Sequence, residues 1–395
     1  MNNTTLFNTK NLIVISLIIM FGSSTEPLRT QNLTRTQTQQ AVIKDPIVDM
    51  SVSFPAPKNP PASCENKSCF RAHQGLYNEI VHCIETHHHH VKIYYPHIKY
   101  HIDTTLPDQR HCFWVHKKHL APLKKLDNDL IDVIPNPEYA KQPTVVLTYP
   151  WKGFSVGTRF KHLPQHDTSA AFAIQKIDFH THAIQLDFVP HSHGLSEQIT
   201  DAQSTRKLFV TLVNTLVDKV TLSGAQHVIP YIWGGSSYVE PYIDEVFYNK
   251  DGCINRTGKS NPYSGYDCSE FIMRMAKIAG IYFPWKTSTA IVHFCKDLKT
   301  NQTLEDGDIV WTQGHVMIIS NIERNEIIEA RGYPSGYGCV HRITLSECFD
   351  GINTFNDLLQ RYYNKQTIQY KDKQGIVSEK TYNIKILKLP CPHTH

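Results

Sequence analysis

The sequence has little net charge and few long hydrophobic runs. Its 395 residues carry a formal net charge of only +4, which gives no reason to expect a nucleic-acid partner. Only residues 12–21 form a long apolar run, so no other stretch is expected to cross a membrane. Because 41% of the residues are hydrophobic and 19% are charged, the composition is that of a globular protein and excludes a wholly disordered chain. The length suggests two or three domains.

Residues 1–24 have the pattern of a secretory signal. Lys10 gives a thin positive region, the apolar run follows, and Gly22-Ser23-Ser24 supplies small residues for cleavage. No cysteine follows directly, so a lipoprotein anchor is not expected; an uncleaved N-terminal anchor is the alternative. We therefore expect export to the periplasm or cell envelope, with no membrane span left after signal removal. Residues 25–62 are rich in Thr, Gln, Asn and Pro, which predicts a flexible linker.

Two stretches of short alternating segments follow this linker. Residues 63–125 include the loosely alternating segment 79–84, and residues 143–195 include the cleanly alternating segment 183–189. Short strands at close spacing are typical of small β-barrels. Each stretch is therefore predicted to form one small barrel, with a proline-containing boundary between them.

A helix with a cysteine in its first turn is predicted over residues 266–280. Gly280 is a natural stop, and Cys268 lies where unpaired backbone N–H groups and the positive end of the helix dipole favour a thiolate. A buried structural thiol is the alternative from this stretch alone. The apolar face of helical period consists of Phe271, Ile272, Met275, Ile278 and Ala279.

The predicted neighbours of this helix define an α+β architecture. Residues 196–222 keep a helical apolar spacing and are expected to pack beside it. Segments 304–311, 314–319 and 326–330 are predicted strands, and strands that follow one another after a helix favour an antiparallel sheet packed on that helix.

Four short motifs in this region occur in a recognisable order. They are Tyr-x-Trp-Gly-Gly at 231–235, Asp-Cys-Ser at 267–269, Gly-Asp-x-Val at 307–310 and His-Val at 315–316. Together, over roughly residues 205–365, they resemble the NlpC-type family of cell-wall cysteine peptidases. The resemblance implies a papain-like fold over residues 196–395, with an insertion at 236–265 that is either a lid or a surface excursion.

The first of the two preceding stretches looks like a bacterial SH3-like module, on the pattern from Leu76 to Val81 and the aromatic-Trp-Val segment at 113–115, and residues 143–195 look like a second such module. Two SH3-like barrels followed by an NlpC-type domain resemble the γ-D-glutamyl-L-diamino acid endopeptidases. The implied substrates are peptidoglycan stem peptides.

The chemistry implied is amide cleavage by a Cys-His-polar triad. Cys268 attacks the carbonyl, and His315 takes and returns the proton because imidazole titrates near the operating pH. A third group must orient the imidazole. In the family it is commonly histidine, but this position holds Glu329, with His341 as the other candidate. The backbone N–H of Cys268 and the nearby Tyr231 are expected to hold the oxyanion.

The resemblance also implies a site for the free amine of an N-terminal L-alanine. The matching positions are Tyr231, Asp267 and Ser269, and Glu79 is the candidate for an acidic residue that the first SH3-like module contributes. Glu270 stands where the family usually has glycine, and it is expected to narrow the site without stopping the chemistry.

Cysteines and histidines outside this site give no further assignment. One of the ten cysteines is the proposed nucleophile, so at least one of the other nine stays free or pairs between chains. Cys64 and Cys69 are candidates to pair with each other, or with Cys83 and Cys112. Twenty-three histidines include the run 87–90, but no spacing matches a ligand set. No metal and no cofactor are expected.

The sequence therefore predicts a monomeric peptidoglycan hydrolase that cleaves the γ-D-glutamyl–diaminopimelate bond. Two alternatives remain open at this point. One is a catalytically inert cell-wall-binding protein. The other is an acyltransferase or amidase on the same fold, which an apolar substrate groove would favour.

Overall fold

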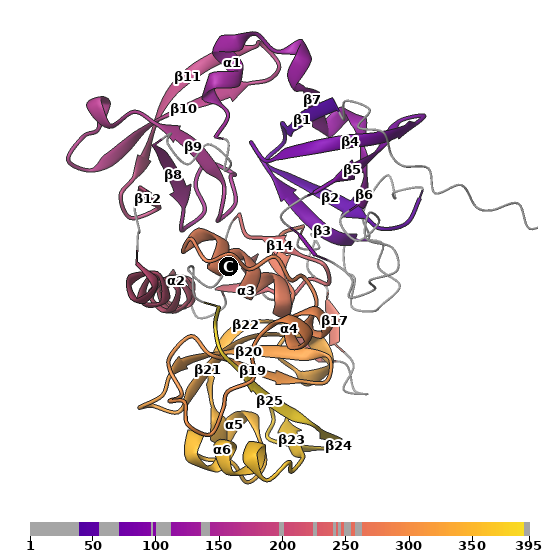
Figure 1. Cartoon of the computed structure of the whole chain (residues 1–395), viewed down its shortest axis with the longest axis vertical. Coiled ribbons are helices and arrows are strands. Elements are labelled where there is room, and N and C mark those ends of the chain that lie inside the picture. The colour runs from indigo at the N-terminus through magenta and orange to yellow at the C-terminus, as the bar shows by residue number, and fades with distance from the viewer. Residues whose placement is uncertain are drawn as a thin grey trace, which may run out of the picture. The chain divides into compact units, whose positions relative to one another are not determined.

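Most of the chain beyond residue 38 is described by the computed structural model. The described residues are 39–54, 71–95, 98–99, 112–135, 143–196, 201–223, 227–239, 242–243, 246–248, 254–256 and 263–390. The expected signal segment and Cys64, Cys69 and Cys253 lie outside them. Strands dominate the described part, with a few helices between them (Figure 1). No helix there is both long and apolar enough to span a membrane.

The first sheet has seven antiparallel strands in the order β3-β2-β6-β5-β4-β1-β7. They are β1 (Gln39–Ile43), β2 (Ile47–Ser51), β3 (Arg71–Leu76), β4 (Ile80–His87), β5 (His90–Tyr94), β6 (Cys112–His116) and β7 (Leu120–Pro122). Helix α1 (Asn128–Val133) follows. The expected linker over 25–62 is wrong for β1 and β2, because Ile43, Val48 and Met50 are apolar and buried in the core of this sheet.

The second sheet has five strands in the order β11-β10-β9-β8-β12. They are β8 (Thr144–Leu147), β9 (Arg159–His162), β10 (Ala171–Asp178), β11 (Ala183–Pro190) and β12 (Gly194–Ser196). Its core is aromatic and aliphatic, and includes Leu147, Phe160 and Val189. Among the described strands neither this order nor that of the first sheet closes on itself, so the expected SH3-like barrels are not confirmed.

The third sheet carries the candidate site and has the order β15-β13-β22-β21-β20-β19-β25. Its strands are β13 (His227–Pro230), β15 (Tyr242–Ile243), β19 (Ile309–Thr312), β20 (His315–Asn321), β21 (Glu326–Arg331), β22 (Cys339–Thr344) and β25 (Ile384–Leu387). All of its pairings are antiparallel, as expected from the sequence.

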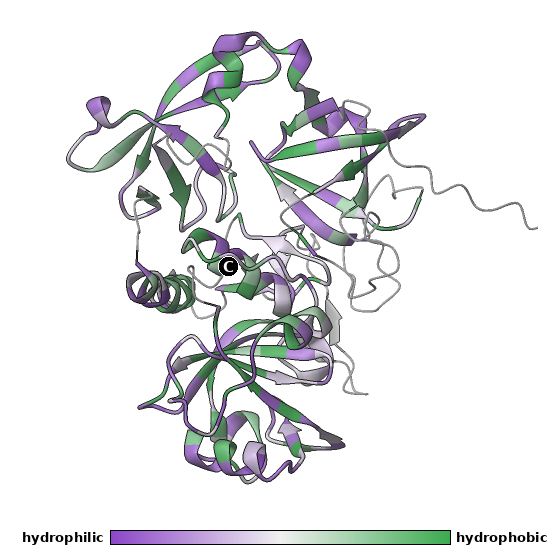
Figure 2. Ribbon diagram, in the orientation of Figure 1, coloured by the Kyte–Doolittle hydropathy of each residue, from purple (hydrophilic) through white to green (hydrophobic). Residues whose placement is uncertain are grey.

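Helices cover this sheet, and its strands alternate between two cores. Val316 and Ile318 belong to one core, which includes the apolar face of α3, while Met317 and Ile319 belong to the other. Hydrophobic residues recur along the strands of this region in Figure 2. The helices are α2 (Ala202–Ser223), α3 (Cys268–Ile278), α4 (Ser288–Phe294), α5 (Leu345–Cys348) and α6 (Phe355–Tyr363). The hairpin of β23 (Ile368–Lys371) and β24 (Val377–Tyr382) lies between α6 and β25 in the chain.

Helix α2 begins later than the sequence suggested. Asp201 accepts the N–H of Ser204 at 2.8 Å, so the N-terminal cap lies at Asp201 rather than near residue 196. The helix contacts α3, β13, β20 and β22, as its apolar stripe predicts.

The predicted insertion has both ends in one short pair of strands. β14 (Ser236–Ser237) pairs with β18 (Gly265–Tyr266), which brings the two ends together directly before α3. Within the insertion β16 (Val246–Tyr248) pairs with β17 (Ile254–Arg256). Whether this segment is a lid stays a prediction.

Candidate active site

Cys268 lies at the first position of α3, held there by the residue before it. Asp267 caps the helix: its Oδ1 accepts the N–H of Ser269 at 3.0 Å and of Glu270 at 2.8 Å. Its Oδ2 accepts the N–H of Gly234 at 3.1 Å, which ties the helix start to the Tyr-x-Trp-Gly-Gly segment. The Cys268 thiol is partly buried at this helix end. α3 ends at Ile278, and Gly280 follows with a φ of +80°.

His315 and Glu329 come from neighbouring strands of the sheet that packs on α3. His315 opens β20 and Glu329 lies in β21, and His315 Nε2 is 2.5 Å from Glu329 Oε2. Glu329 is 1% exposed. With Nε2 engaged by the carboxylate, Nδ1 is the ring nitrogen left for Cys268.

The electrostatics of this trio favour a charged imidazole. Burial alone would lower the pKa of His315, but hydrogen bonds to Cys268 and Glu329 outweigh it and raise that pKa to about 9. The pKa of Glu329 lies well below its ordinary value although burial opposes this, because His315, His341 and Arg331 stabilise the carboxylate. Such an environment suits a thiolate paired with an imidazolium.

His341, the other candidate for the third position, lies on the far side of Glu329. The register of β21 and β22 sets it directly opposite Glu329, and its Nε2 is 3.2 Å from Glu329 Oε1. Its ring stacks on Tyr337 with centroids 4.0 Å apart. Burial opposes the charged form, yet the side chains of Cys339 and Glu329 raise the pKa of His341 to about 9. Glu329, and not His341, is therefore the residue in contact with His315.

The three residues expected to hold a substrate amine lie together beside Cys268. Burial raises the pKa of Tyr231 well above its ordinary value, with further increases from the nearby charges on Cys268 and Asp267. Ser269 is buried and donates its hydroxyl hydrogen to Asp267 Oδ1 at 2.9 Å. The amine-binding role of Tyr231, Asp267 and Ser269 stays a prediction, because both oxygens of Asp267 already accept hydrogen bonds.

Glu79 lies elsewhere, and the prediction for it does not fit. One carboxylate oxygen is 3.1 Å from Arg274 Nη1 and 2.9 Å from Lys277 Nζ, and the other accepts the N–H of Leu76 at 2.7 Å. Arg274 and Lys277 follow Cys268 by six and nine residues, which puts them roughly 9 Å or more along the helix axis. Glu79 therefore holds the first sheet against the later turns of α3.

A buried cluster that the sequence did not reveal explains the departure at Glu270. His73 of β3 places Nδ1 2.8 Å from Glu270 Oε1, and Lys286 forms an ion pair with the same oxygen. Glu270 is 0% exposed. Burial disfavours its charge, but Lys286 and His73 hold its pKa below the ordinary value. Glu270 lies on the polar face of the predicted helix, so no local signal in the sequence showed that the first sheet would bury it and that its charge would need a partner.

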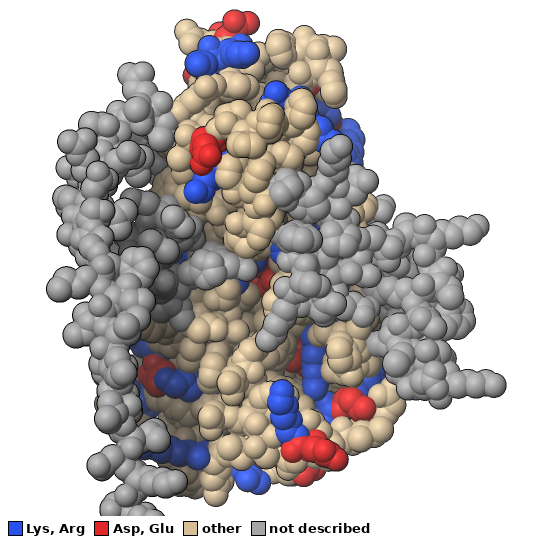
Figure 3. Space-filling view, turned by 90° about the vertical axis from the view of Figure 1, so that its right-hand side faces the viewer, with Lys and Arg blue, Asp and Glu red and all other residues tan. Residues whose placement is uncertain are grey.

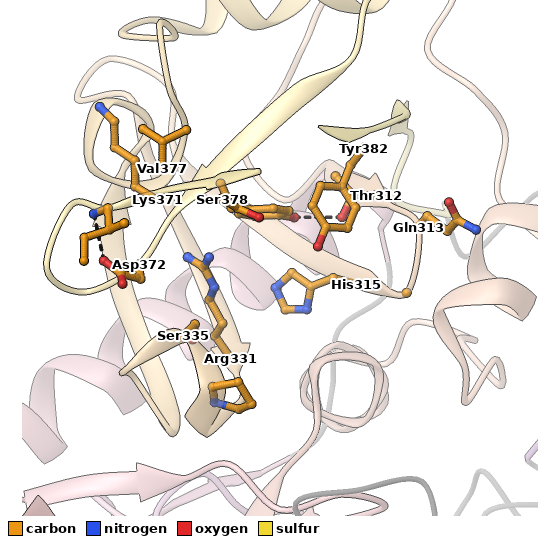
Figure 4. Close-up of a pocket in the computed structure, with 14 residues that line it drawn as sticks. Thr312, Gln313, His315, Arg331, Ser335, Lys371, Asp372, Val377, Ser378 and Tyr382 are labelled. Atoms are coloured by element: carbon orange, nitrogen blue, oxygen red, sulfur yellow. Dashed lines mark hydrogen bonds between the residues drawn. The ribbon is translucent and has the colours of Figure 1, made fainter. Parts of the chain in front are cut away.

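A cavity of about 480 Å³ opens beside His315 (Figure 4). Strands β19, β20 and β21 and the hairpin β23–β24 supply most of its lining. It is lined by Thr312, Gln313, Gly314, His315, Arg331, Pro334, Ser335, Tyr370, Lys371, Asp372, Ile376, Val377, Ser378 and Tyr382. The lining combines charged and polar side chains with apolar ones, which include Ile376 and Val377. Within the described ranges, no three His, Cys, Asp or Glu side chains are grouped to hold a metal ion.

Acidic and basic side chains are interspersed where described residues are visible on the face shown in Figure 3. This distribution agrees with the small net charge of the sequence.

Comparison with known proteins gives a likeness at the level of fold. No protein-family model matches the sequence, and no curated protein matches it. An NlpC/P60 family protein from Bacillus cereus ATCC 10987 is similar in structure, with a TM-score of 0.51 and 15% identity over 78% of this chain and 94% of that one. NlpC2 and NlpC1 from Trichomonas vaginalis align over 78% and 80% of this chain and 94% and 90% of their own. Their identities are 11% and 12%, and their TM-scores 0.31 and 0.30.

Proposed function

We propose that this protein is a cysteine endopeptidase of peptidoglycan stem peptides that cleaves the γ-D-glutamyl–diaminopimelate bond. The observation that carries the proposal is the arrangement at Cys268: a thiol at a helix start, an imidazole whose pKa that thiol helps to raise, and a buried carboxylate 2.5 Å from the imidazole. The fold shared with the Bacillus NlpC/P60 protein supports it.

The proposed reaction has two steps. The Cys268 thiolate attacks the γ-carbonyl carbon of D-glutamate, and the oxyanion forms beside the Cys268 N–H at the helix N-terminus. The His315 imidazolium then gives its proton to the leaving amine of the diamino acid, and a thioester remains. In the second step His315 takes a proton from water, the hydroxide attacks the thioester, and the thiolate is restored. Glu329 keeps the imidazole oriented and stabilises its charge throughout.

Tyr231, Asp267 and Ser269 are proposed to read the free amine of an N-terminal L-alanine. Cys268 and Asp267 both raise the pKa of Tyr231, which supports a position of its hydroxyl close to them. Because Asp267 also caps α3, substrate would share its carboxylate with the helix. The protein is proposed to act outside the cytoplasm, on the strength of the signal pattern in residues 1–24.

The charged and polar lining of the cavity beside His315 makes an acyltransferase acting on lipid the weaker alternative. An inert wall-binding role is weaker as well. It would leave the buried carboxylate, the raised His315 pKa and the helix-start thiol without a use.

The test is a digest of purified peptidoglycan and of free L-Ala-γ-D-Glu-diaminopimelate by reduced wild type and by Cys268→Ala, read by mass spectrometry. Release of L-Ala-D-Glu by the wild type alone is expected. Cleavage of the free peptide but not of the polymer would support binding of a free N-terminal amine by Tyr231, Asp267 and Ser269. If the polymer is cut as well, the chemistry stands and the requirement for a free amine is wrong.

A further inference from the structure

The cavity beside His315 contains a cation that the proposed catalytic cycle does not use. Arg331 ends β21, two residues after Glu329, so strand alternation puts both side chains on the same face of the sheet. Its side chain is 12% exposed and lines the cavity with His315. In the view of Figure 4, Arg331 lies between His315 and Asp372.

Aromatic rings fix the Arg331 guanidinium. Its central carbon lies 4.6 Å from the centroid of Tyr370 and 5.3 Å from that of Tyr337. The Tyr370 hydroxyl is 2.7 Å from Thr312 Oγ1, which holds that ring in turn. A guanidinium that lies over an aromatic ring keeps its N–H groups in its own plane, where they are available to a bidentate acceptor.

The charges around Arg331 leave room for an anion. In the part of the chain that the structure describes, Glu329 is the only carboxylate within ion-pair distance of Arg331, with Nη1 and Oε1 3.5 Å apart. The same carboxylate also lies 2.5 Å from His315 and 3.2 Å from His341. Three cationic groups therefore share one carboxylate. Arg331 is the farthest of the three from this carboxylate, so its guanidinium remains available to a second anion.

The other charged groups in the cavity are engaged elsewhere. Lys371 Nζ donates to the Ser346 carbonyl at 2.9 Å and lies 4.0 Å from Asp350. Asp372 Oδ1 accepts the backbone N–H groups of Gln374 and Ile376, at 2.9 and 2.8 Å.

The position of the cavity indicates which part of the substrate it would hold. His315 must protonate the leaving amine, so the leaving group of the proposed reaction has to lie against His315. Asp267 and Ser269 flank Cys268 at the helix start, and neither they nor Tyr231 line this cavity. The cavity next to His315 is therefore on the leaving-group side.

We propose that Arg331 is a specificity residue that binds a carboxylate of the leaving diamino acid in this cavity. The inference rests on the proposed function and adds the chemical class of its leaving group. That carboxylate has two possible sources: the α-carboxylate of a peptide that ends at the diamino acid, or the distal carboxylate of diaminopimelate, which lysine lacks.

The experiment measures kcat/KM for three peptides with wild type, Arg331→Gln and Arg331→Lys. The peptides are L-Ala-γ-D-Glu-meso-diaminopimelate, its α-amide, and the analogue with L-Lys in place of diaminopimelate. For the wild type, kcat/KM is expected to be about tenfold to a hundredfold lower on the peptide that lacks the bound carboxylate. This is the effect of losing a hydrogen bond to a charged group. The analogue that suffers this loss identifies the source.

Arg331→Gln is expected to remove this discrimination, so that the ratio of kcat/KM values between acid and neutral peptides falls to within about threefold of one. The ratio within one variant cancels any indirect effect through Glu329 on the chemical step. Arg331→Lys should retain part of the ratio because it retains the charge. Arg324→Gln, on an arginine that is 60% exposed and outside the cavity, is the matched control and should keep the wild-type ratio.

An unchanged ratio in folded Arg331→Gln would overturn the inference while the proposed function stands. A wild type that cleaves no peptide would instead count against the proposed function. In that case calorimetric binding of the same peptides to Cys268→Ala, with and without Arg331→Gln, decides the inference. Equal affinities would overturn it, and a loss of about tenfold or more would support it.

Discussion

Replacing Glu329 with glutamine tests how much of the activity depends on a buried charge. The substitution keeps the shape of the side chain and an oxygen that accepts from His315 Nε2, and it removes the negative charge. Glu329 is 1% exposed, so solvent does not screen the change. The expected consequence is a lower pKa for His315 and a smaller population of the thiolate–imidazolium pair.

The magnitude follows from the pKa of His315. The difference between the ordinary value of 6.5 and about 9 corresponds to about 3 kcal/mol in favour of the imidazolium. Burial opposes this preference, and Cys268 and Glu329 supply it together. Glu329 therefore accounts for part of it, and a loss of about 1.4 to 3 kcal/mol corresponds to a fall in kcat/KM of roughly 10- to 100-fold.

The assay is the pH dependence of kcat/KM on the free tripeptide, for wild type, Glu329→Gln and the control His341→Asn. The upper limb of the wild-type profile, which follows loss of the imidazolium proton, should move to lower pH in Glu329→Gln. His341→Asn should shift it less, because His341 reaches His315 only through Glu329. Folded Glu329→Gln with kcat/KM within about twofold of wild type and an unchanged profile would refute the reasoning.

Three further predictions concern stability. The pKa of His341 is raised from 6.5 to about 9. Its contribution to the free energy of unfolding is therefore fully present below about pH 6.5 and is lost as the pH rises through about 9. Urea unfolding should show this free energy falling over that range, and His341→Asn should flatten the fall. Glu79→Gln leaves the buried Arg274 and the partly exposed Lys277 of α3 without their carboxylate. This should lower the free energy of unfolding by about 3 kcal/mol, while kcat of the folded fraction stays unchanged. Gly234→Ala puts a Cβ 2.4 Å from the Arg71 carbonyl oxygen at a φ of +67°, whereas Gly280→Ala at +80° meets nothing within 4 Å, so thermal unfolding should show a larger loss for Gly234→Ala.

The fold around Cys268 was largely predictable because its signals are local. Fifteen residues contain the apolar period of α3, its cap at Asp267 and its stop at Gly280. Strands β19, β20 and β21 follow in sequence, so their antiparallel pairing required no long-range information. Position in β21 also singled out Glu329 for the imidazole.

What the sequence could not reveal depends on partners far apart in the chain. His73 and Glu270 are separated by 197 residues, and Glu79 and Lys277 by 198, so nothing local showed that these charges pair. The composition of residues 25–62 favoured a linker, yet β1 and β2 form there because a few apolar residues complete the first core. Closed barrels were expected from the same kind of short strands, and strand closure is not a local property.

The central claim is that Cys268 is the nucleophile, and its most direct test is selective alkylation. The native, reduced protein is treated with iodoacetamide near pH 7. Peptide mapping then gives the labelling rate of each cysteine, and tripeptide cleavage is measured alongside. Cys268 should be labelled first, and activity should fall in step with it. Burial raises the pKa of Cys295 to about 12 and that of Cys348 well above its ordinary value, so both should react slowly. Full labelling of Cys268 with cleavage retained, or no cleavage by the unlabelled protein, would contradict the account.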